Sequence, residues 1–258
     1  MLRWMIPGLI AFGLSGCVAV DETSTNAATS STTEISTAAS DGVAVIGTPY
    51  FASLPDSAPL IVLFHQGGSN ARAEYAPLIP WLNENGYRAI GWDLRAGGEI
   101  YGLNNRTADG MLPAEADSYC DGYGDMRAAL DASLSHASAD EAIIWGSSYS
   151  AALVFHLAAD APDKVSHVIS ASPASGPPMA NCLARARLDE LTVPAFVLRP
   201  ASEMERESAQ QQKLLLDAAG VSVLVLEKGV HGSSMLVDER TEADMSAGRA
   251  AVLQWLAQ

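Results

Sequence analysis

The feature that most restricts the fold of this chain is the regular alternation of short apolar runs with longer segments of helical pattern. Apolar runs typical of strands occur at residues 59–66, 87–94, 141–146, 163–173, 193–200 and 221–228. Segments with helical patterning lie at residues 75–86, 124–137, 149–161, 203–220 and 238–258. Strands joined by helices pair in parallel through right-handed crossovers, so helices cover both faces of one sheet. The sequence therefore predicts an α/β fold with a mostly parallel central sheet, to which residues 43–52 add an edge strand or hairpin.

Length and charge limit the number of domains and the kinds of partner that the chain can have. The 258 residues, 48% of them hydrophobic, suffice for one sizeable domain, whereas a second full domain would be crowded. The formal net charge of −15 argues against nucleic acid as a partner, because neutralising phosphates requires clustered Lys and Arg. We interpret the acidity as a contribution to solubility. The sequence carries no signal for an oligomeric state.

The first residues form a unit of their own. Arg3 is followed by an apolar stretch of about a dozen residues, which is too short to span a bilayer as a mature helix and is typical of a signal peptide. The stretch ends in Leu-Ser-Gly-Cys at residues 14–17, which resembles the lipobox of bacterial lipoproteins. The alternative is an ordinary secretory signal with an incidental cysteine.

The lipobox resemblance implies that residues 1–16 are removed and that Cys17 is lipidated. The protein would then be exported to the bacterial cell envelope, with the lipid anchor as its only membrane attachment. Residues 17–41 are rich in Ser, Thr and Ala and are predicted to be a flexible tether, because too few large apolar side chains are present to offset the ordering entropy. Residues 42–258 are predicted to form the folded domain.

Two further cysteines, Cys120 and Cys182, remain once Cys17 is set aside. An exported protein folds in an oxidising compartment, which favours pairing of an even number of cysteines. The two residues either form a disulfide or remain two separate buried thiols, and both alternatives stay open at this point.

A cluster of serines follows the apolar run at residues 141–146, where a buried strand is expected to turn sharply into a helix. Such a turn needs small residues two positions before and two positions after its central residue. Ser148 meets this condition with Gly146 and Ser150, whereas Ser147 has large aromatic residues at both positions. Ser150 also has small residues at both positions, but it lies further into the helix. Ser148 is therefore predicted to be a nucleophile near the helix N-terminus, and the alternative is that these serines only cap the helix.

A serine nucleophile needs a base, and the base needs an acid to fix its tautomer. His231 is the only one of the five histidines in a Gly-flanked loop after the last strand, and it is the predicted base. His65 also ends a strand but precedes the serine, and it is assigned elsewhere. Glu203, just past the strand at residues 193–200, is favoured as the acid, with Glu205 as the alternative. The alternative is that both glutamates are solvated residues in the first turn of a helix, where the helix dipole stabilises them.

The order Ser148, Glu203, His231, each after a different strand, makes residues 42–258 resemble an α/β-hydrolase. The sequence GSSYS replaces the usual Gly-x-Ser-x-Gly of that family, with Ser150 in place of the last glycine. Residues 93–98, DLRAGG, resemble the Asp-x-Arg-Gly-x-Gly turn of the family and are interpreted as scaffold. The Gly-rich loops at the strand ends are also similar to those of dienelactone-hydrolase-like and small esterase members, although a cysteine nucleophile is absent here.

The resemblance also implies an oxyanion hole. The segment FHQGGSN, residues 64–70, resembles the loop that helps to form it. The backbone N–H group of Gln66, or that of Gly67, would act together with that of Tyr149. No metal or organic cofactor is expected, because the sequence has neither a paired-His spacing suited to zinc nor a phosphate-binding loop with a Lys.

The function implied by the resemblance is that of a serine hydrolase, which cleaves a small-molecule carboxylic ester through an acyl-enzyme. One rival is a peptidase, amidase or thioesterase on the same fold, since the pocket decides the substrate. Another is a non-catalytic, surface-tethered binding module, against which the intact set of Ser, His and acid argues. Residues 96–123 are predicted to form a long connection that shapes specificity, and residues 173–190 a short cap over the site, which argues against a long, enclosed lipid tunnel. The alternative for both segments is an ordinary surface loop.

Overall fold

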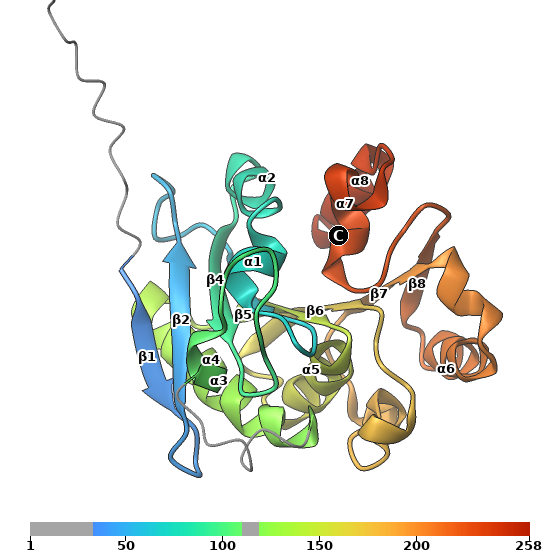
Figure 1. Cartoon of the computed structure of the whole chain (residues 1–258), viewed down its shortest axis with the longest axis horizontal. Coiled ribbons are helices and arrows are strands. Elements are labelled where there is room, and N and C mark those ends of the chain that lie inside the picture. Colours follow the sequence, from blue (N-terminus) through green and yellow to red (C-terminus); the bar gives the residue numbers. More distant parts are fainter. Residues whose placement is uncertain (1–32, 110–118) are drawn as a thin grey trace, which may run out of the picture. The chain divides into compact units, whose positions relative to one another are not determined.

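The structure is a computed structural model, which describes residues 33–109 and 119–258 (Figure 1). Within these residues eight strands form one sheet, in the order β1-β2-β4-β3-β5-β6-β7-β8. The strands are β1 Ile35–Ala38, β2 Ala44–Tyr50, β3 Leu60–Phe64, β4 Arg88–Asp93, β5 Ala142–Ser147, β6 Val165–Ala171, β7 Ala195–Pro200 and β8 Ser222–Leu226. β2 pairs antiparallel with β1 and with β4, and all other neighbours pair in parallel. The predicted α/β fold with a mostly parallel sheet is confirmed.

Helices cover both faces of this sheet, as predicted. The α-helices are α1 Ala71–Tyr75, α2 Ile79–Glu84, α3 Arg106–Asp109, α4 Gly122–Ala137, α5 Tyr149–Asp160, α6 Glu207–Ala218, α7 Asp238–Thr241 and α8 Ser246–Leu256. Short 3-10 helices are η2 Tyr119–Asp121, η3 Pro177–Met179, η4 Ala184–Ala186, η5 Leu188–Glu190, η6 Ala201–Glu205 and η7 Ser233–Leu236. In Figure 1, α4, α5 and α6 lie below the sheet, and α1, α2, α7 and α8 lie above it.

The core has two layers because the strand side chains alternate between the faces. Val62 and Phe64 of β3 pack with α4 and α5, whereas Ile61 and Leu63 pack with α1, α2 and α8. A buried tryptophan on each side donates its indole N–H to a serine hydroxyl: Trp92 to Ser133 of α4 at 2.7 Å, and Trp145 to Ser233 of η7 at 3.1 Å. The second bond ties the strand before Ser148 to the segment that follows His231.

The predicted boundary between tether and domain at residue 42 is too late. Residues 35–38 form β1, which pairs with β2 in the register Ile35 to Gly47. Antiparallel pairing satisfies the backbone groups along one edge of β2. Ile35 and Ala39 pack in the larger core, which is the layer that contains Val62 and Phe64 of β3. The Ser/Thr-rich composition predicted a tether because this pairing depends on a partner strand rather than on local propensity.

The last predicted helix is interrupted. Residues 238–258 contain α7 and α8 rather than one helix. Glu242 has a left-handed backbone, with φ +53, and the Asp238 carboxylate accepts the backbone N–H of Met245 at 2.8 Å. Because Asp238 also pairs with Arg249 of α8 at 2.7 Å, one carboxylate holds both helices at this break.

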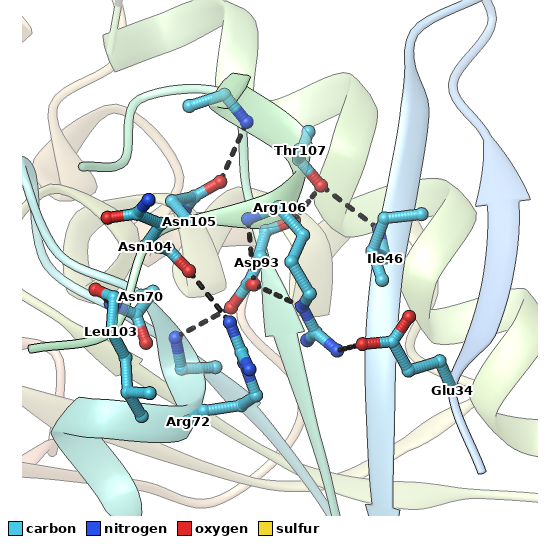
Figure 2. Close-up of polar contacts among 12 residues, drawn as sticks. Glu34, Ile46, Asn70, Arg72, Asp93, Leu103, Asn104, Asn105, Arg106 and Thr107 are labelled. Atoms are coloured by element: carbon cyan, nitrogen blue, oxygen red, sulfur yellow. Dashed lines mark hydrogen bonds and ion pairs between the residues drawn. The ribbon is translucent and has the colours of Figure 1, made fainter. Parts of the chain in front are cut away.

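The Asp-x-Arg turn at residues 93–98 connects several elements through its charged side chains. The Asp93 carboxylate accepts the backbone N–H of Ala71 at 2.9 Å and the Nε–H of Arg106 at 2.8 Å, and Arg106 also pairs with Glu34 at 2.7 Å (Figure 2). The Thr107 hydroxyl donates to the Asp93 carbonyl at 2.7 Å. Asp93 thereby fixes α1, and with it the loop before α1, relative to β4.

The arginine of the same turn is also buried and paired. Arg95 is 4% exposed and pairs with Asp125 of α4 at 2.7 Å and with Asp41 at 2.6 Å. Burial opposes its charge, but the two carboxylates outweigh this cost and raise the pKa of Arg95. These contacts agree with the interpretation of the turn as scaffold.

The predicted signal peptide, Cys17 and most of the predicted tether lie outside the described residues. Within the described residues, no helix combines the length and the apolar character needed to cross a bilayer. Cys120 and Cys182 form a disulfide, so of the two alternatives the structure has the bonded pair. This bond joins η2 to the segment between η3 and η4.

Candidate active site

The turn from β5 into α5 places Ser148 in a backbone conformation that few residues adopt. Its φ is +61° and its ψ −112°, outside the regions that are comfortable for a residue with a Cβ. Gly146 makes this turn sterically feasible, since a Cβ there would lie 2.4 Å from the carbonyl oxygen of Ser150. The turn is held by the backbone N–H of Ser148, which donates to the carbonyl of Ala171 in β6 at 2.9 Å.

The other two serines of the cluster have structural hydrogen bonds. The Ser150 hydroxyl accepts the backbone N–H of Ser147 at 2.8 Å and lies 2.9 Å from the carbonyl of His65 and 3.0 Å from that of Phe64. A glycine at position 150 could not make this connection between the ends of β3 and β5. The Ser147 hydroxyl accepts the backbone N–H of Ser233 at 2.9 Å. Both are fully buried, so Ser148 is the member of the cluster with a hydroxyl available to a substrate.

His231 lies in the loop after β8 and reaches the Ser148 hydroxyl. Its Nε2 is 2.8 Å from Oγ of Ser148, and its Nδ1 is hydrogen-bonded to Oε1 of Glu203. The carboxylate accepts the proton on Nδ1, which leaves Nε2 as the acceptor for the serine hydroxyl. The approach requires the glycine next to the histidine: Gly232 has φ +73, and a Cβ there would lie 2.6 Å from both the Ser147 hydroxyl and Oε1 of Gln66.

Glu203, rather than Glu205, is the acid that the structure brings to His231. Glu203 lies in η6, directly after β7, and is 6% exposed, whereas Glu205 is exposed. Its second carboxylate oxygen, Oε2, accepts a hydrogen bond from Arg199 at 2.6 Å. Arg199 is itself 3% exposed and also donates to the carbonyl of Pro173 at 2.6 Å.

The protonation of Glu203 follows from these contacts. Burial acts to raise its pKa, but the hydrogen bond from His231 and the charges of His231 and Arg199 outweigh burial, so the pKa lies below its ordinary value. Glu203 is therefore a carboxylate at neutral pH. It can stabilise positive charge that develops on the imidazole.

The loop after β3 contains the two alternatives for the first oxyanion donor. The backbone N–H of Gln66 donates to Oε2 of Glu74 at 2.8 Å, so this donor is already used. The N–H groups of Gly67 and Tyr149 have no hydrogen-bond partner among the described residues. Of the two alternatives, Gly67 is therefore the one that can act together with Tyr149, the first residue of α5, where the helix dipole adds positive potential.

His65 has a structural role at the base of this loop. It is fully buried, and its Nδ1 donates to the carbonyl of Gln66 at 2.7 Å. Its Nε2 accepts from the backbone N–H of Leu94 at 2.7 Å and from the side-chain amide of Asn105 at 3.0 Å. The ring therefore connects the ends of β3 and β4, which agrees with the decision to assign it elsewhere.

Three residues that matter here were missed by the sequence analysis. Arg199 stands as a lone charge at the end of an apolar run, and this was a usable signal. Glu74 is 1% exposed and has one carboxylate oxygen without a partner among the described residues. Tyr119 contacts both Gly67 and Tyr149. The last two act through contacts between distant segments, for which the sequence offers no local pattern.

A small pocket adjoins His231 and Glu203, and Ser148 is not part of its lining. Its volume is about 170 Å³. Most of its other lining residues are small: Ser172, Pro173, Ala174, Ser175, Gly176, Ser208 and Ala209. The larger hollows that we find, such as one of about 530 Å³ beside β1 and α4, are not lined by Ser148, Glu203 or His231. Over residues 33–109 and 119–258, no group of three His, Cys, Asp or Glu side chains could hold a metal ion.

Comparison with known families agrees with this geometry. The family model for the alpha/beta hydrolase fold matches residues 59–200, which include the strands from β3 to β7 and Ser148. The chain belongs to the α/β-hydrolase family. The match includes the turn at Ser148 and ends before Glu203 and His231. No curated protein sequence matches this chain.

Solved structures of hydrolases share the fold at low sequence identity. An esterase from Pyrococcus furiosus is 15% identical, with a TM-score of 0.62 and coverage of 87% of this chain and 90% of that chain. A dienelactone hydrolase from Anabaena variabilis is also 15% identical, with a TM-score of 0.62 and coverage of 87% and 96%. An enol-lactonase from Burkholderia xenovorans is 17% identical, with a TM-score of 0.62 and coverage of 87% and 100%. These structures show that the chain has the same fold.

Proposed function

We propose that the protein is a serine hydrolase that cleaves carboxylic esters of small molecules through an acyl-enzyme. The observation that supports this proposal most directly is the hydrogen-bonded series from Ser148 through His231 to Glu203. The order of the three groups is that of a nucleophile, a base and an acid that orients the base. The esterase and lactonase activities in the names of the similar structures point in the same direction.

Each step of ester cleavage through an acyl-enzyme has a side chain or backbone group that can carry it out. His231 Nε2 takes the proton of Ser148 as Oγ attacks the carbonyl carbon, and Glu203 stabilises the imidazolium. The N–H groups of Gly67 and Tyr149 hold the oxyanion, and one such donor typically contributes about 3 kcal/mol of transition-state stabilisation. His231 then protonates the departing alcohol, and an acyl group remains on Ser148. Water, deprotonated by His231, attacks the acyl carbon; the bond to Oγ of Ser148 then breaks, Oγ takes back the proton from His231, and the carboxylic acid is released.

We propose that the pocket beside His231, which is lined by Glu203 but not by Ser148, receives one end of the substrate. At about 170 Å³ it is smaller than the pockets of about 300 Å³ or more that hold drug-sized ligands. Its small lining residues leave room for a short group, and a long alkyl chain would remain in solvent. We therefore assign the protein to short esters rather than to long-chain lipids.

A panel of p-nitrophenyl esters tests this function. We expect hydrolysis of the acetate and butyrate esters, and kcat/KM for the decanoate ester should be no higher than for these two, because a longer chain gains no buried contact. The p-nitroanilides with the same acyl groups are the control for amidase activity. Faster cleavage of the anilides, or a rate that rises with chain length, would contradict a short-chain esterase. Absence of hydrolysis by folded protein would favour the binding module.

We further propose that the protein is a lipoprotein anchored through Cys17. The lipobox at residues 14–17 supports this assignment, and the Ser/Thr-rich segment after it would hold the domain away from the bilayer. We expect Cys17→Ala to move the protein from the membrane fraction to the soluble fraction of cells that express the full chain. The measurement is immunoblotting of the two fractions, with Cys182→Ala as a control that keeps the lipobox. Unchanged sedimentation of Cys17→Ala would refute attachment by lipidation.

A further inference from the structure

Tyr119 contacts both residues whose N–H groups we assign to the oxyanion hole. Its ring stacks on the ring of Tyr149, with the centroids 4.9 Å apart and the planes at 21°. It also lies against Gly67, where a Cβ would come within 2.7 Å of Cε1 and of the hydroxyl oxygen of Tyr119. The Tyr119 side chain therefore contacts both residues whose N–H groups are the proposed oxyanion donors.

This contact explains why position 67 is a glycine. The next residue, Gly68, has φ +70, a conformation that disfavours side chains. Gly67 does not have a positive φ, so its backbone alone would accept other residues. Space favours glycine there, because a Cβ would overlap the ring of Tyr119 and would force the ring or the loop to move. Gly67 and Tyr119 thus form a matched pair.

The position of Tyr119 depends on a covalent bond next to it. Its hydroxyl has no hydrogen-bond partner in the described part of the chain, and the residue is 37% exposed. The next residue, Cys120, is bonded to Cys182, which is 7% exposed and packs in the larger core. The segment after Cys182 is held to α5, where Nε2 of His156 donates to the carbonyl of Leu183 at 3.1 Å. The disulfide therefore fastens Tyr119 to the body of the domain.

From these contacts we propose that Tyr119 is a positioning residue for the oxyanion hole, and that the Cys120–Cys182 disulfide keeps it in place. The inference rests on the proposed function. The ring packs on Gly67 and on Tyr149, and so limits the movement of two N–H groups that must point at one oxygen. The ring of Tyr119, and not its hydroxyl, restricts the movement of these N–H groups. The disulfide thereby couples the redox state of two cysteines to the rate of ester cleavage.

Substitutions of Tyr119 give the direct test, with p-nitrophenyl acetate as substrate. We expect Tyr119→Ala to lower kcat by about 10- to 100-fold with KM changed less than about threefold, because misplaced donors weaken transition-state binding. Tyr119→Phe keeps the ring and should stay within about twofold of wild type. Tyr101→Ala is the matched control: this tyrosine is 60% exposed and lies over Arg240, and its loss should leave kcat unchanged.

Reduction of the folded protein tests the disulfide. We expect treatment with a phosphine reductant, followed by thiol counting, to lower kcat of wild type by about 10-fold or more. The same treatment of Tyr119→Ala should change kcat little, because the residue that the disulfide positions is already gone. Circular dichroism establishes that each sample remains folded. If reduction unfolds the protein, the Tyr119 variants still decide the assignment of the ring with the disulfide intact.

The outcomes separate this inference from the proposed function. Labelling of wild type by a fluorophosphonate probe, together with an unchanged kcat in Tyr119→Ala, would overturn the role of Tyr119 and leave the hydrolase assignment standing. Equal losses in Tyr119→Phe and Tyr119→Ala would overturn the role of the ring. A raised KM at constant kcat in Tyr119→Ala would mean substrate binding instead of donor positioning. Wild type that neither labels nor hydrolyses would remove the proposed function itself.

Discussion

Replacing Ser148 by Ala is expected to lower kcat for p-nitrophenyl acetate by about 10⁵- to 10⁶-fold, because no other group at the site can form the acyl-enzyme. The thermal midpoint should not fall, since the Ser148 hydroxyl has no partner other than His231 in the described residues and its backbone bonds remain. Loss of the side chain also leaves the strained φ of +61° in place. The measurements are steady-state hydrolysis, thermal unfolding and labelling by a fluorophosphonate probe, which should disappear.

Ser150→Ala is the matched control, because it removes a hydroxyl two positions away. It is expected to lower stability and to leave the nucleophile in place, whereas Ser148→Ala is expected to do the reverse. Ser150→Ala deletes the buried hydrogen bonds to Ser147 and to the carbonyls at the end of β3, at a cost of about 1–3 kcal/mol in unfolding free energy. The thermal midpoint should therefore fall, and labelling at Ser148 should persist. Labelling that survives Ser148→Ala but not Ser150→Ala would show that the nucleophile has been wrongly chosen.

The strands at the centre of the fold were predictable because each satisfies one strong condition. β3 and β5 are buried on both faces, and a strand with that environment must be an unbroken apolar run bounded by turn residues. β1 could not be found in the same way, since Ile35–Ala38 alternates between half-buried and exposed positions and becomes a strand through pairing with β2. The break between α7 and α8 depends on Asp238, whose contacts with Met245 and Arg249 form only in the folded chain.

The proposed site likewise contains residues that local sequence patterns identify and residues that only tertiary contacts identify. The proposed nucleophile and base could be selected from the sequence because the turn at Ser148 needs Gly146 two positions before it and the His231 loop needs the adjacent Gly232, and both glycines can be read from the sequence. The choice between Glu203 and Glu205 depended on side-chain direction, which is set by the short η6 turn and by Arg199 beneath it. Whether Gln66 or Gly67 supplies a donor depended on a hydrogen bond to Glu74, a contact between two segments that local patterns do not reveal.

Glu203→Gln is expected to lower kcat by about 10⁴-fold while Glu205→Gln stays within about twofold of wild type. The amide of Gln carries no charge to stabilise the imidazolium, and its NH₂ group can pair with Nδ1 and so favour the wrong tautomer of His231. Glu205 lies two residues away in the same η6 turn and is exposed, so it controls for the change of charge. Equal activity of the two variants, or a greater loss in Glu205→Gln, would exclude Glu203 as the acid.

The same variant has a defined pH dependence of stability. Because contacts in the folded state lower the pKa of Glu203, its carboxylate stabilises the fold above the unfolded pKa of about 4.3, and this contribution is lost as the pH falls through the folded value. Glu203→Gln should therefore have a lower thermal midpoint than wild type at pH 7, where buried Arg199 also loses its partner, and the difference should shrink as the pH falls below the unfolded pKa of about 4.3. A difference that grows as the pH falls would mean that burial outweighs these contacts and raises the pKa of Glu203 in the folded protein, and the stabilisation of the imidazolium by its carboxylate would have to be abandoned.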